Sequence, residues 1–195
     1  MRIFHLLALA AVIAAPVALH ATPITYIETF TGSGSLGSTS FTDQLITLTG
    51  VGDTDNVVNQ GGNLFTNIVP ATLDIAGGLG GTFTDEMQFI SRHTPLPLGG
   101  LADNTTDAAV MFGINSAFAT YDLTTEIGPF TGGRLYNSGA SFGTTSGAFT
   151  IVTAGDPTFQ ATTEVSAVPE PTSLLLLGTG ALGALGLMKR KFLAA

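Results

Sequence analysis

Cysteine and tryptophan are both absent from this sequence of 195 residues. Without cysteine the chain can form no disulfide, no thiolate metal site and no thiol nucleophile, which disfavours redox chemistry. Histidine is almost as scarce, because His93 is the only one between residues 22 and 167. A zinc site needs several His or Cys ligands, so the sequence excludes one in this segment. The missing tryptophan removes a broad aromatic face that often stacks on sugars in glycosidase clefts.

Positive charge is also scarce. Between residues 22 and 167 there is no lysine, and Arg92 and Arg134 are the only arginines. The acidic residues are spread through the same segment without long runs, and we expect them to form an acidic surface. Such a surface repels phosphates, so nucleic acid and anionic lipid are poor partners, whereas cations and neutral glycans remain suitable ones.

The N-terminal segment, residues 1–21, has the pattern of a secretory signal peptide. Arg2 supplies the positive start, and Ile3 to Val17 form an apolar run that is short for a membrane span. Ala21 is the small residue after which we expect cleavage, although Leu19 is bulkier than usual two residues before the cut. The sequence therefore predicts export.

The C-terminal segment, residues 168–195, has three parts. The motif 168–173 contains Val168, Pro169, Glu170 and Pro171, and its two prolines hold the chain extended. Residues 174–188 are apolar and would span about 22 Å as a helix, which is short of the roughly 30 Å hydrocarbon core. The basic end 189–191, Lys189, Arg190 and Lys191, should stay cytoplasmic as a stop-transfer signal and leave the preceding domain outside.

The run VPEPTSLLLLGTG from Val168 to Gly180, followed by the basic end, resembles the PEP-CTERM sorting signal. In that family exosortase, a membrane transpeptidase, recognises the tail in Gram-negative bacteria that make extracellular polysaccharide. The resemblance implies export, transient membrane retention through a single transmembrane helix, and processing near Pro169, Glu170 and Pro171. A permanent anchor without processing is the alternative, and it has the same topology.

Residues 22–167 alternate short apolar and threonine-containing runs with glycine-rich breaks, which is typical of antiparallel β proteins. The clearest strand is 159–165, where Phe159, Ala161, Thr163 and Val165 share a face. Further strands are expected at 24–30, 45–49, 64–69, 72–76, 82–90, 109–112 and 148–153. Breaks are expected at 32–37, 52–56, 61–63, 77–81, 95–100, 132–133 and 155–157. We therefore expect an all-β fold, an antiparallel β-sandwich of the jelly-roll or immunoglobulin-like kind, flanked by the signal helix and the transmembrane helix.

No motif in this segment specifies an enzyme. Ser141 lies in a nucleophile-elbow pattern, but no histidine follows it within the segment, so a glycine-rich turn is favoured. Asp85, Glu86 or Glu126 could serve as a glycosidase carboxylate pair, yet nothing in their spacing singles them out. Arg92 and His93 lie in an unusual loop, 91–100, where we expect Arg92 to pair with Asp85 or Glu86 or simply to offset the acidic surface. The sequence therefore predicts that the protein is not an enzyme.

Calcium is the one cofactor with a candidate site. Asp53, Asp55 and Asn56 place two carboxylates and an amide in one turn, and oxygen ligands are those that calcium prefers. The EF-hand pattern fails, because Val57 and Val58 occupy later loop positions and no glutamate closes the loop. A plain turn rich in Asp and Asn is the favoured alternative. Apart from this candidate we expect no metal and no cofactor.

The predicted function follows mainly from the tail. We expect an exported cell-surface or extracellular-matrix protein whose core is a structural or interaction module in an exopolysaccharide context. A glycan- or calcium-binding module is the alternative, followed by a secreted glycoside hydrolase. The expected partners are exosortase through the tail, the membrane before processing, and extracellular polysaccharide, with no nucleic acid.

Overall fold

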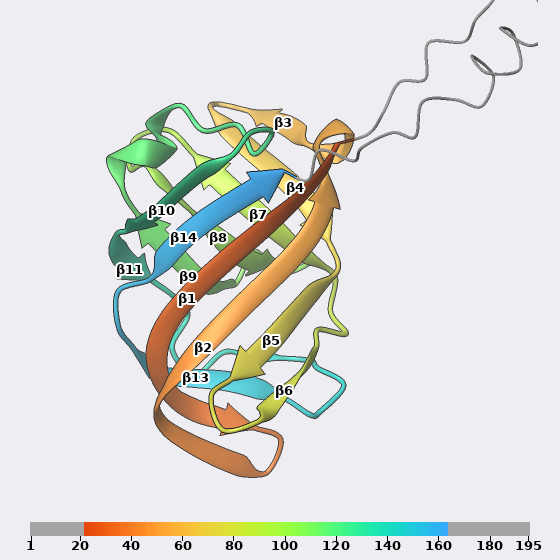
Figure 1. Cartoon of the computed structure of the whole chain (residues 1–195), viewed down its shortest axis with the longest axis vertical. Coiled ribbons are helices and arrows are strands. Elements are labelled where there is room, and N and C mark those ends of the chain that lie inside the picture. Colours follow the sequence, from red (N-terminus) through yellow and green to blue (C-terminus); the bar gives the residue numbers. More distant parts are fainter. Residues whose placement is uncertain (1–21, 164–195) are drawn as a thin grey trace, which may run out of the picture. The chain divides into compact units, whose positions relative to one another are not determined.

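The computed structural model describes residues 22–163, which form two antiparallel β-sheets (Figure 1). The first sheet, sheet A, has the order β10-β14-β1-β2-β5-β6, with β13 also paired to β1 and β12 paired to β13. Its strands are β1 (Pro23–Leu36), β2 (Thr39–Asp53), β5 (Ala71–Ile75), β6 (Leu79–Thr82), β10 (Ile127–Thr131), β12 (Ser141–Phe142), β13 (Phe149–Ala154) and β14 (Thr158–Thr163).

The second sheet, sheet B, has the order β11-β9-β8-β7-β4-β3. Its strands are β3 (Val58–Gly61), β4 (Leu64–Val69), β7 (Met87–Arg92), β8 (Leu98–Asp103), β9 (Ala109–Ile114) and β11 (Gly133–Leu135). Two short 3₁₀ helices, η1 (Thr54–Asn56) and η2 (Ser116–Ala119), complete the described segment. The predicted all-β class with antiparallel sheets is confirmed. The jelly-roll or immunoglobulin-like assignment stays a prediction, and both flanking helices lie outside the described residues.

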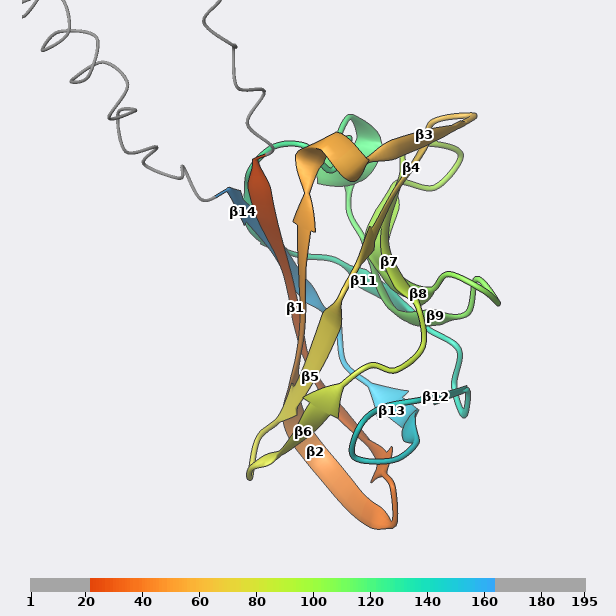
Figure 2. The same ribbon diagram turned by 90° about the vertical axis from the view of Figure 1, so that its right-hand side faces the viewer.

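The core lies between the two sheets, which Figure 2 shows nearly edge-on. In β1 the residues with even numbers from Ile24 to Phe30 are buried, as the alternation of a strand requires. Tyr26 of β1 stacks on Phe89 of β7 with ring centroids 4.7 Å apart, which joins sheet A to sheet B. Phe159 of β14 packs against Phe89 and against Phe118 of η2. Aromatic rings therefore fill the centre of the interior.

The strand β1 changes partner along its length, and this curls sheet A. Residues 24–29 pair with β14 and residues 32–36 pair with β13, with a register shift between Ser33 and Gly34. At the opposite edge an isolated bridge joins Phe83, just after β6, to Thr144, just after β12. Because β12 pairs with β13, this bridge closes a ring of strands. The ring encloses Phe149, which is fully buried.

The predicted strands agree with the structure except for 82–90. The breaks expected at 32–37 and 77–81 are also wrong in part, because β1 continues to Leu36 and β6 begins at Leu79. The expected strand 82–90 is wrong, because β6 ends at Thr82, β7 begins at Met87, and the chain crosses between sheets from Phe83 to Glu86. The bridge from Phe83 to Thr144 and the hydrogen bond from the backbone N–H of Gly143 to Asp85 fix this crossing. The expected break 95–100 is also partly wrong, because β8 begins at Leu98.

The glycines of β8 explain why a strand was not expected there. A Cβ on Gly99 would lie 2.3 Å from the ring of Phe118, so that ring occupies the space of a side chain. Gly100 has a φ of +153°, and a Cβ there would lie 2.2 Å from the carbonyl oxygen of Met111. Glycine is needed at both positions for close packing, although in sequence it is usually a sign of a turn.

Candidate functional site

The outer face of sheet B carries a cavity of about 330 Å³. Strands β3, β4 and β7 and the loop between β8 and β9 surround it, and its lining residues are Gln60, Leu64, Thr66, Gln88, Ile90, Asn104 and Asp107. Five of these seven residues carry polar side chains, and Asp107 is the only charged one. We call this cavity the sheet B pocket. A volume of roughly 300 Å³ or more is in the range of small-molecule sites.

Hydrogen bonds hold the polar side chains of the sheet B pocket in place. Gln60 Nε2 donates to Thr66 Oγ1 at 3.2 Å, and Gln88 Nε2 donates to Asp107 Oδ1 at 3.2 Å. The amide of Asn104 donates to the carboxylate of Glu86. Sequence analysis did not single out these amides. The sequence held one indication of this site: Gln88 is a polar residue between Met87 and Phe89, in a strand whose residues are nearly all buried.

The outer face of sheet A carries a regular set of threonines. In β1, Thr29 lies opposite Thr47 of β2 on one side and opposite Thr158 of β14 on the other. Thr25 lies opposite Thr162 of β14, and Thr49 of β2 lies opposite Thr72 of β5. We call this surface the threonine face, and its members are Thr25, Thr29, Thr47, Thr49, Thr72, Thr158 and Thr162. Figure 1 shows β14, β1 and β2 side by side toward the viewer.

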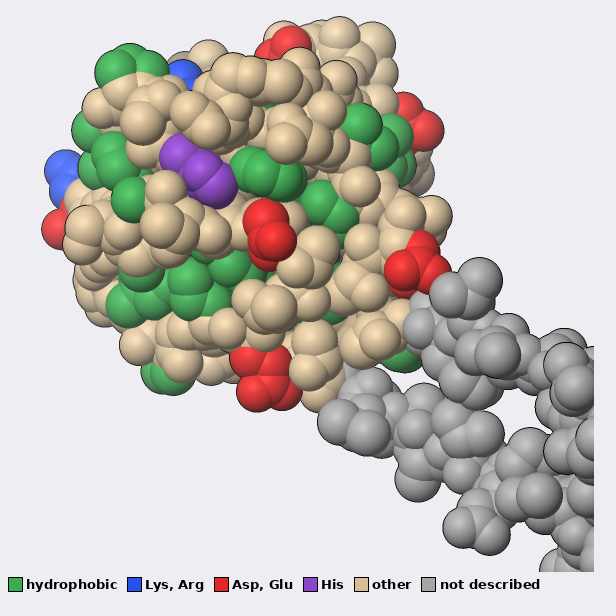
Figure 3. Space-filling view, turned by 90° about the horizontal axis from the view of Figure 1, so that it is seen from above, with side chains coloured by type: hydrophobic (Ala, Val, Ile, Leu, Met, Phe, Trp, Pro, Cys, Tyr) green, Lys and Arg blue, Asp and Glu red, His purple; other side chains and the backbone are tan. Residues whose placement is uncertain are grey.

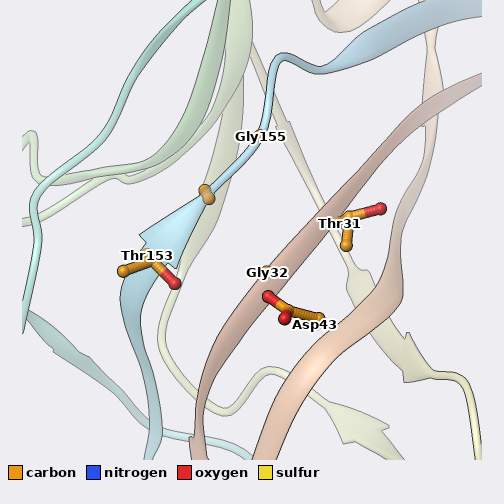
Figure 4. A pocket seen from close by; sticks show the side chains of 6 residues that line it. Thr31, Gly32, Asp43, Thr153 and Gly155 are labelled. Carbon is orange, nitrogen blue, oxygen red and sulfur yellow. The ribbon is translucent and has the colours of Figure 1, made fainter.

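A shallower cavity of about 280 Å³ lies where β13 leaves β1 (Figure 4). Thr31, Gly32, Asp43 and Thr153 line it together with Ala154 and Gly155. Asp43 is held in a left-handed backbone conformation, with φ +48°, and its backbone N–H donates to Ser33 Oγ. This cavity offers one carboxylate and the side-chain hydroxyls of Thr31 and Thr153 but no second titratable group, so no chemistry is assigned to it.

A group of buried polar residues joins the sheets at the end where η1 lies. Tyr26 Oη donates to the carbonyl oxygen of Leu123 at 2.7 Å and accepts from Asn67 Nδ2 at 2.9 Å. The hydroxyl of Tyr121 is buried without a hydrogen-bond partner among the described residues. Burial raises the pKa of both tyrosines above its ordinary value. Both stay neutral at physiological pH, and Tyr26 positions the segment around Leu123.

Glu28 is the one fully buried acid among the described residues. Its Oε2 accepts a long hydrogen bond of 3.4 Å from the backbone N–H of Leu101, and its Oε1 has no partner there. Burial raises the pKa of this carboxyl well above its usual range, which the bond from Leu101 only partly offsets. The expectation that the acids lie on the surface is therefore wrong for Glu28. The sequence held the signal, since Glu28 shares the parity of Tyr26 and Phe30.

The calcium candidates form the turn at η1. Asp53 Oδ1 accepts from the backbone N–H of Asp55 at 2.9 Å, so the Asp53 carboxylate caps the 3₁₀ helix. Asp55 and Asn56 are exposed beside it. Within residues 22–163 no group of three or more His, Cys, Asp or Glu side chains is arranged to hold a metal ion. The geometry agrees with the plain turn, and calcium at Asp53, Asp55 and Asn56 stays a prediction.

The three carboxylates considered for hydrolysis each support local structure. Asp85 accepts from the backbone N–H of Gly143, Glu86 from the amide of Asn104, and Glu126 from both the N–H and the hydroxyl of Thr163. Asp85 and Glu86 lie between β6 and β7, whereas Glu126 precedes β10. No hydrogen bond among the described residues joins two of them.

In the loop 91–100, Arg92 makes a different contact from the one expected from the sequence. Arg92 Nε donates to the carbonyl oxygen of Leu96 at 3.5 Å, so its expected pairing with Asp85 or Glu86 is wrong. The cause is that β7 is extended, which places Arg92 at the opposite end of the strand from those acids. The ion pair found within residues 22–163 joins Arg134 to Asp156 at 2.8 Å.

His93 anchors the same loop. Its Nε2 lies 2.8 Å from the carbonyl oxygen of Tyr121, which can only accept, so Nε2 carries the proton. Its ring also stacks on Phe65 with centroids 4.9 Å apart. These contacts explain the histidine as part of the packing. The face of the molecule in Figure 3 carries more acidic than basic side chains.

The sorting and signal residues lie outside the described residues. These are Ala21 at the expected signal cleavage, the motif Val168, Pro169, Glu170 and Pro171, and the basic end Lys189, Arg190 and Lys191. In the described part of the chain, no helix has the length and apolar character needed to cross a membrane.

A family model described as the PEP-CTERM protein-sorting motif matches residues 167–191. The chain therefore carries a PEP-CTERM sorting motif at its C-terminus, and the resemblance found in the sequence is confirmed. This motif implies an exported protein that exosortase sorts to the cell surface. No curated protein and no solved structure matches the chain.

Proposed function

We propose that residues 22–167, once exported and sorted, act as a non-catalytic interaction module among the extracellular polysaccharides of the cell surface or matrix. The sorting motif brings the chain to that environment. Exosortase acts on residues near Pro169, and the membrane holds the chain only before that step. After that step, we assign the binding contacts of the module to extracellular polysaccharide.

The observation that carries this proposal is the threonine face. A hydroxyl group both donates and accepts hydrogen bonds, as the hydroxyls of a neutral sugar do. Opposite positions on neighbouring strands lie about 4.5–5.5 Å apart, so the face presents closely spaced hydroxyl groups. The same residues also suit strands for steric reasons, which explains the threonines without any ligand. The proposal adds that these hydroxyl groups are kept on the outside of sheet A, where the acid next to them is Asp74 of β5, opposite Thr47.

Charge supports the same assignment. Arg92 and Arg134 are the only basic residues among the described ones, and Arg134 is paired with Asp156. A surface with so little positive charge repels polyanions, so the partner should be uncharged. The structural hydrogen bonds of Asp85, Glu86 and Glu126 favour a non-catalytic role over the alternative of a glycoside hydrolase.

The test is co-sedimentation of the exported protein, purified from the extracellular fraction of its native host, with polysaccharide from the same host. We expect the protein to sediment with the polysaccharide to a similar extent at low and high salt, because the contacts are uncharged. Release of new reducing ends, lost in Glu126→Gln, would instead support the hydrolase. Recovery of all the protein in the supernatant would contradict the proposal.

A further inference from the structure

The sheet B pocket lies beside a second apolar cluster, separate from the main core. Ile90, Leu98, Ala102, Ala109 and Phe112 are buried and pack together, with Leu64 and Ile114 against them. In β7 the inward residues are Met87 and Phe89 of the main core, so Gln88 and Ile90 lie on the outer face. Outer-face residues of a sheet are usually open to solvent, yet Gln88 and Ile90 are almost fully covered.

This covering makes the sheet B pocket a defined site rather than a flat surface. Gln88 is 4% exposed and Thr66 is 6% exposed, and both side chains line the pocket. The bond from Gln88 Nε2 to Asp107 Oδ1 fixes the orientation of the Gln88 amide. No hydrogen bond among the described residues uses Gln88 Oε1. That oxygen is therefore an unused acceptor whose position is fixed before a ligand binds.

Hydrogen bonds within its own loop fix the backbone of Asp107. Asp107 has φ +56°, a conformation that side-chain-bearing residues seldom adopt. Its backbone N–H donates to the carbonyl oxygen of Asp103, and Asp103 Oδ1 accepts from the N–H groups of Thr105 and Thr106. The loop between β8 and β9 is therefore internally bonded, and it holds the carboxylate of Asp107 over the pocket.

We propose that the sheet B pocket binds one sugar unit of a neutral polysaccharide. This inference rests on the proposed function and names the place at which a chain is held. The amides of Gln60 and Gln88 and the hydroxyl of Thr66 donate to and accept from sugar hydroxyls. Ile90 and Leu64 give an apolar wall for the C–H face of the ring. Asp107 accepts from a hydroxyl and repels carboxylated or sulfated sugars.

The pocket and the threonine face have different parts in this scheme. The threonine face is broad and open, so it supplies many weak contacts without selecting one sugar. The pocket is confined and its polar groups converge, so it selects the unit that it holds. Loss of the pocket should therefore weaken binding and reduce selectivity while leaving residual contact through sheet A.

The experiment compares full-length variants expressed in the native host, each purified in its exported form. Gln60→Ala removes an exposed amide, and Gln88→Met removes a buried amide with little change of volume. Gln44→Ala is the matched control, because Gln44 is a half-buried glutamine of β2 that belongs neither to the sheet B pocket nor to the threonine face. Affinity is measured for the purified host polysaccharide and for alginate as an anionic probe. Thermal unfolding of each variant confirms that it is folded.

We expect each pocket variant to bind the host polysaccharide about fivefold more weakly, as the loss of one hydrogen bond predicts, with Gln44→Ala unchanged. Equal affinity in all variants would overturn the pocket and leave the proposed function standing. Tighter binding of alginate than of the host polysaccharide would overturn the neutral class of ligand. Absence of binding by the unaltered protein would overturn both proposals. Gln60→Ala keeps the test decisive if Gln88→Met fails to fold.

Discussion

Glu28 and Leu101 meet inside the core, where Oε2 of the β1 carboxyl lies 3.4 Å from the backbone nitrogen of the β8 residue. The contact joins the two sheets, although a carboxyl group is a poor choice for a buried position. Because burial raises the pKa of Glu28 in the folded state, the folded protein holds this proton more tightly than the unfolded chain does. Protonated Glu28 stabilises the folded protein fully at pH values below the pKa that this residue has in the unfolded chain, near 4.5. It is lost as the pH rises from there through the folded pKa.

The variant Glu28→Gln tests this coupling. Glutamine keeps the shape of the protonated acid but cannot ionise, so the variant should lose the part of the pH dependence that Glu28 causes. At pH 7 we expect its Tm to be higher by about 2–4 °C, which corresponds to roughly 1 kcal/mol. At pH 4 the two proteins should unfold at similar temperatures. Thermal unfolding between pH 4 and pH 8 measures both effects, and a difference that does not vary with pH would contradict the interpretation.

Two buried tyrosines should respond oppositely to loss of their hydroxyl groups. Tyr26→Phe removes the bonds to Leu123 and Asn67 and leaves both partners buried, which should lower the free energy of unfolding by about 1–3 kcal/mol. Tyr121→Phe removes a hydroxyl that has no partner among the described residues, so we expect no loss or a small gain. Urea unfolding of both variants gives the comparison. Equal destabilisation would show that the hydrogen bonds of Tyr26 contribute little.

A glycine in β2 tests how closely the sheets pack. At Gly50 an added Cβ would lie 2.6 Å from Cε2 of Phe89 and 2.7 Å from Cγ2 of Val69. Gly50→Ala should therefore destabilise the protein by about 1–3 kcal/mol through overpacking. Gly133→Ala is the control, because the nearest atom there, Cβ of Ile114, is 3.8 Å away. We expect a change of at most about 0.5 kcal/mol in the control, measured by the same unfolding experiment.

The sorting motif gives a prediction about the mature chain. The C-terminal peptide of protein recovered from the extracellular fraction should end near Pro169, Glu170 and Pro171, and mass spectrometry measures where it ends. Glu170→Ala should reduce this processing and leave more protein in the membrane fraction. A peptide that reaches Ala195 in the unaltered protein would mean that the tail is a permanent anchor.

Strand alternation was enough to predict much of the fold. In β14 the buried residues are Phe159 and Ala161, as the period of two requires, and β4 has the predicted bounds. The sequence could not show that β7 is covered on both faces, because that depends on the second cluster around Ile90. It also could not show that the chain crosses between sheets after Thr82, since the bridge to Thr144 joins segments far apart in the sequence.

The candidate site was less predictable than the fold. Gln60, Gln88 and Asn104 come from three different elements, and no spacing along the chain relates them. Their approach depends on the pairing of β4 with β3 and β7 and on the left-handed backbone at Asp107. Short motifs are visible only when the chemistry lies within one segment. For that reason the local motif at the C-terminus was found from sequence, whereas the pocket was not.

The pairing of Ile24 with Thr163 places the first strand of the module beside its last described residue. A pulling force that enters the module through Thr163 along β14 meets β1 on one side and β10 on the other. The hydrogen bonds to both neighbours are then loaded together in shear, rather than broken one after another. The fold is therefore suited to remain intact under a force applied along β14 through Thr163.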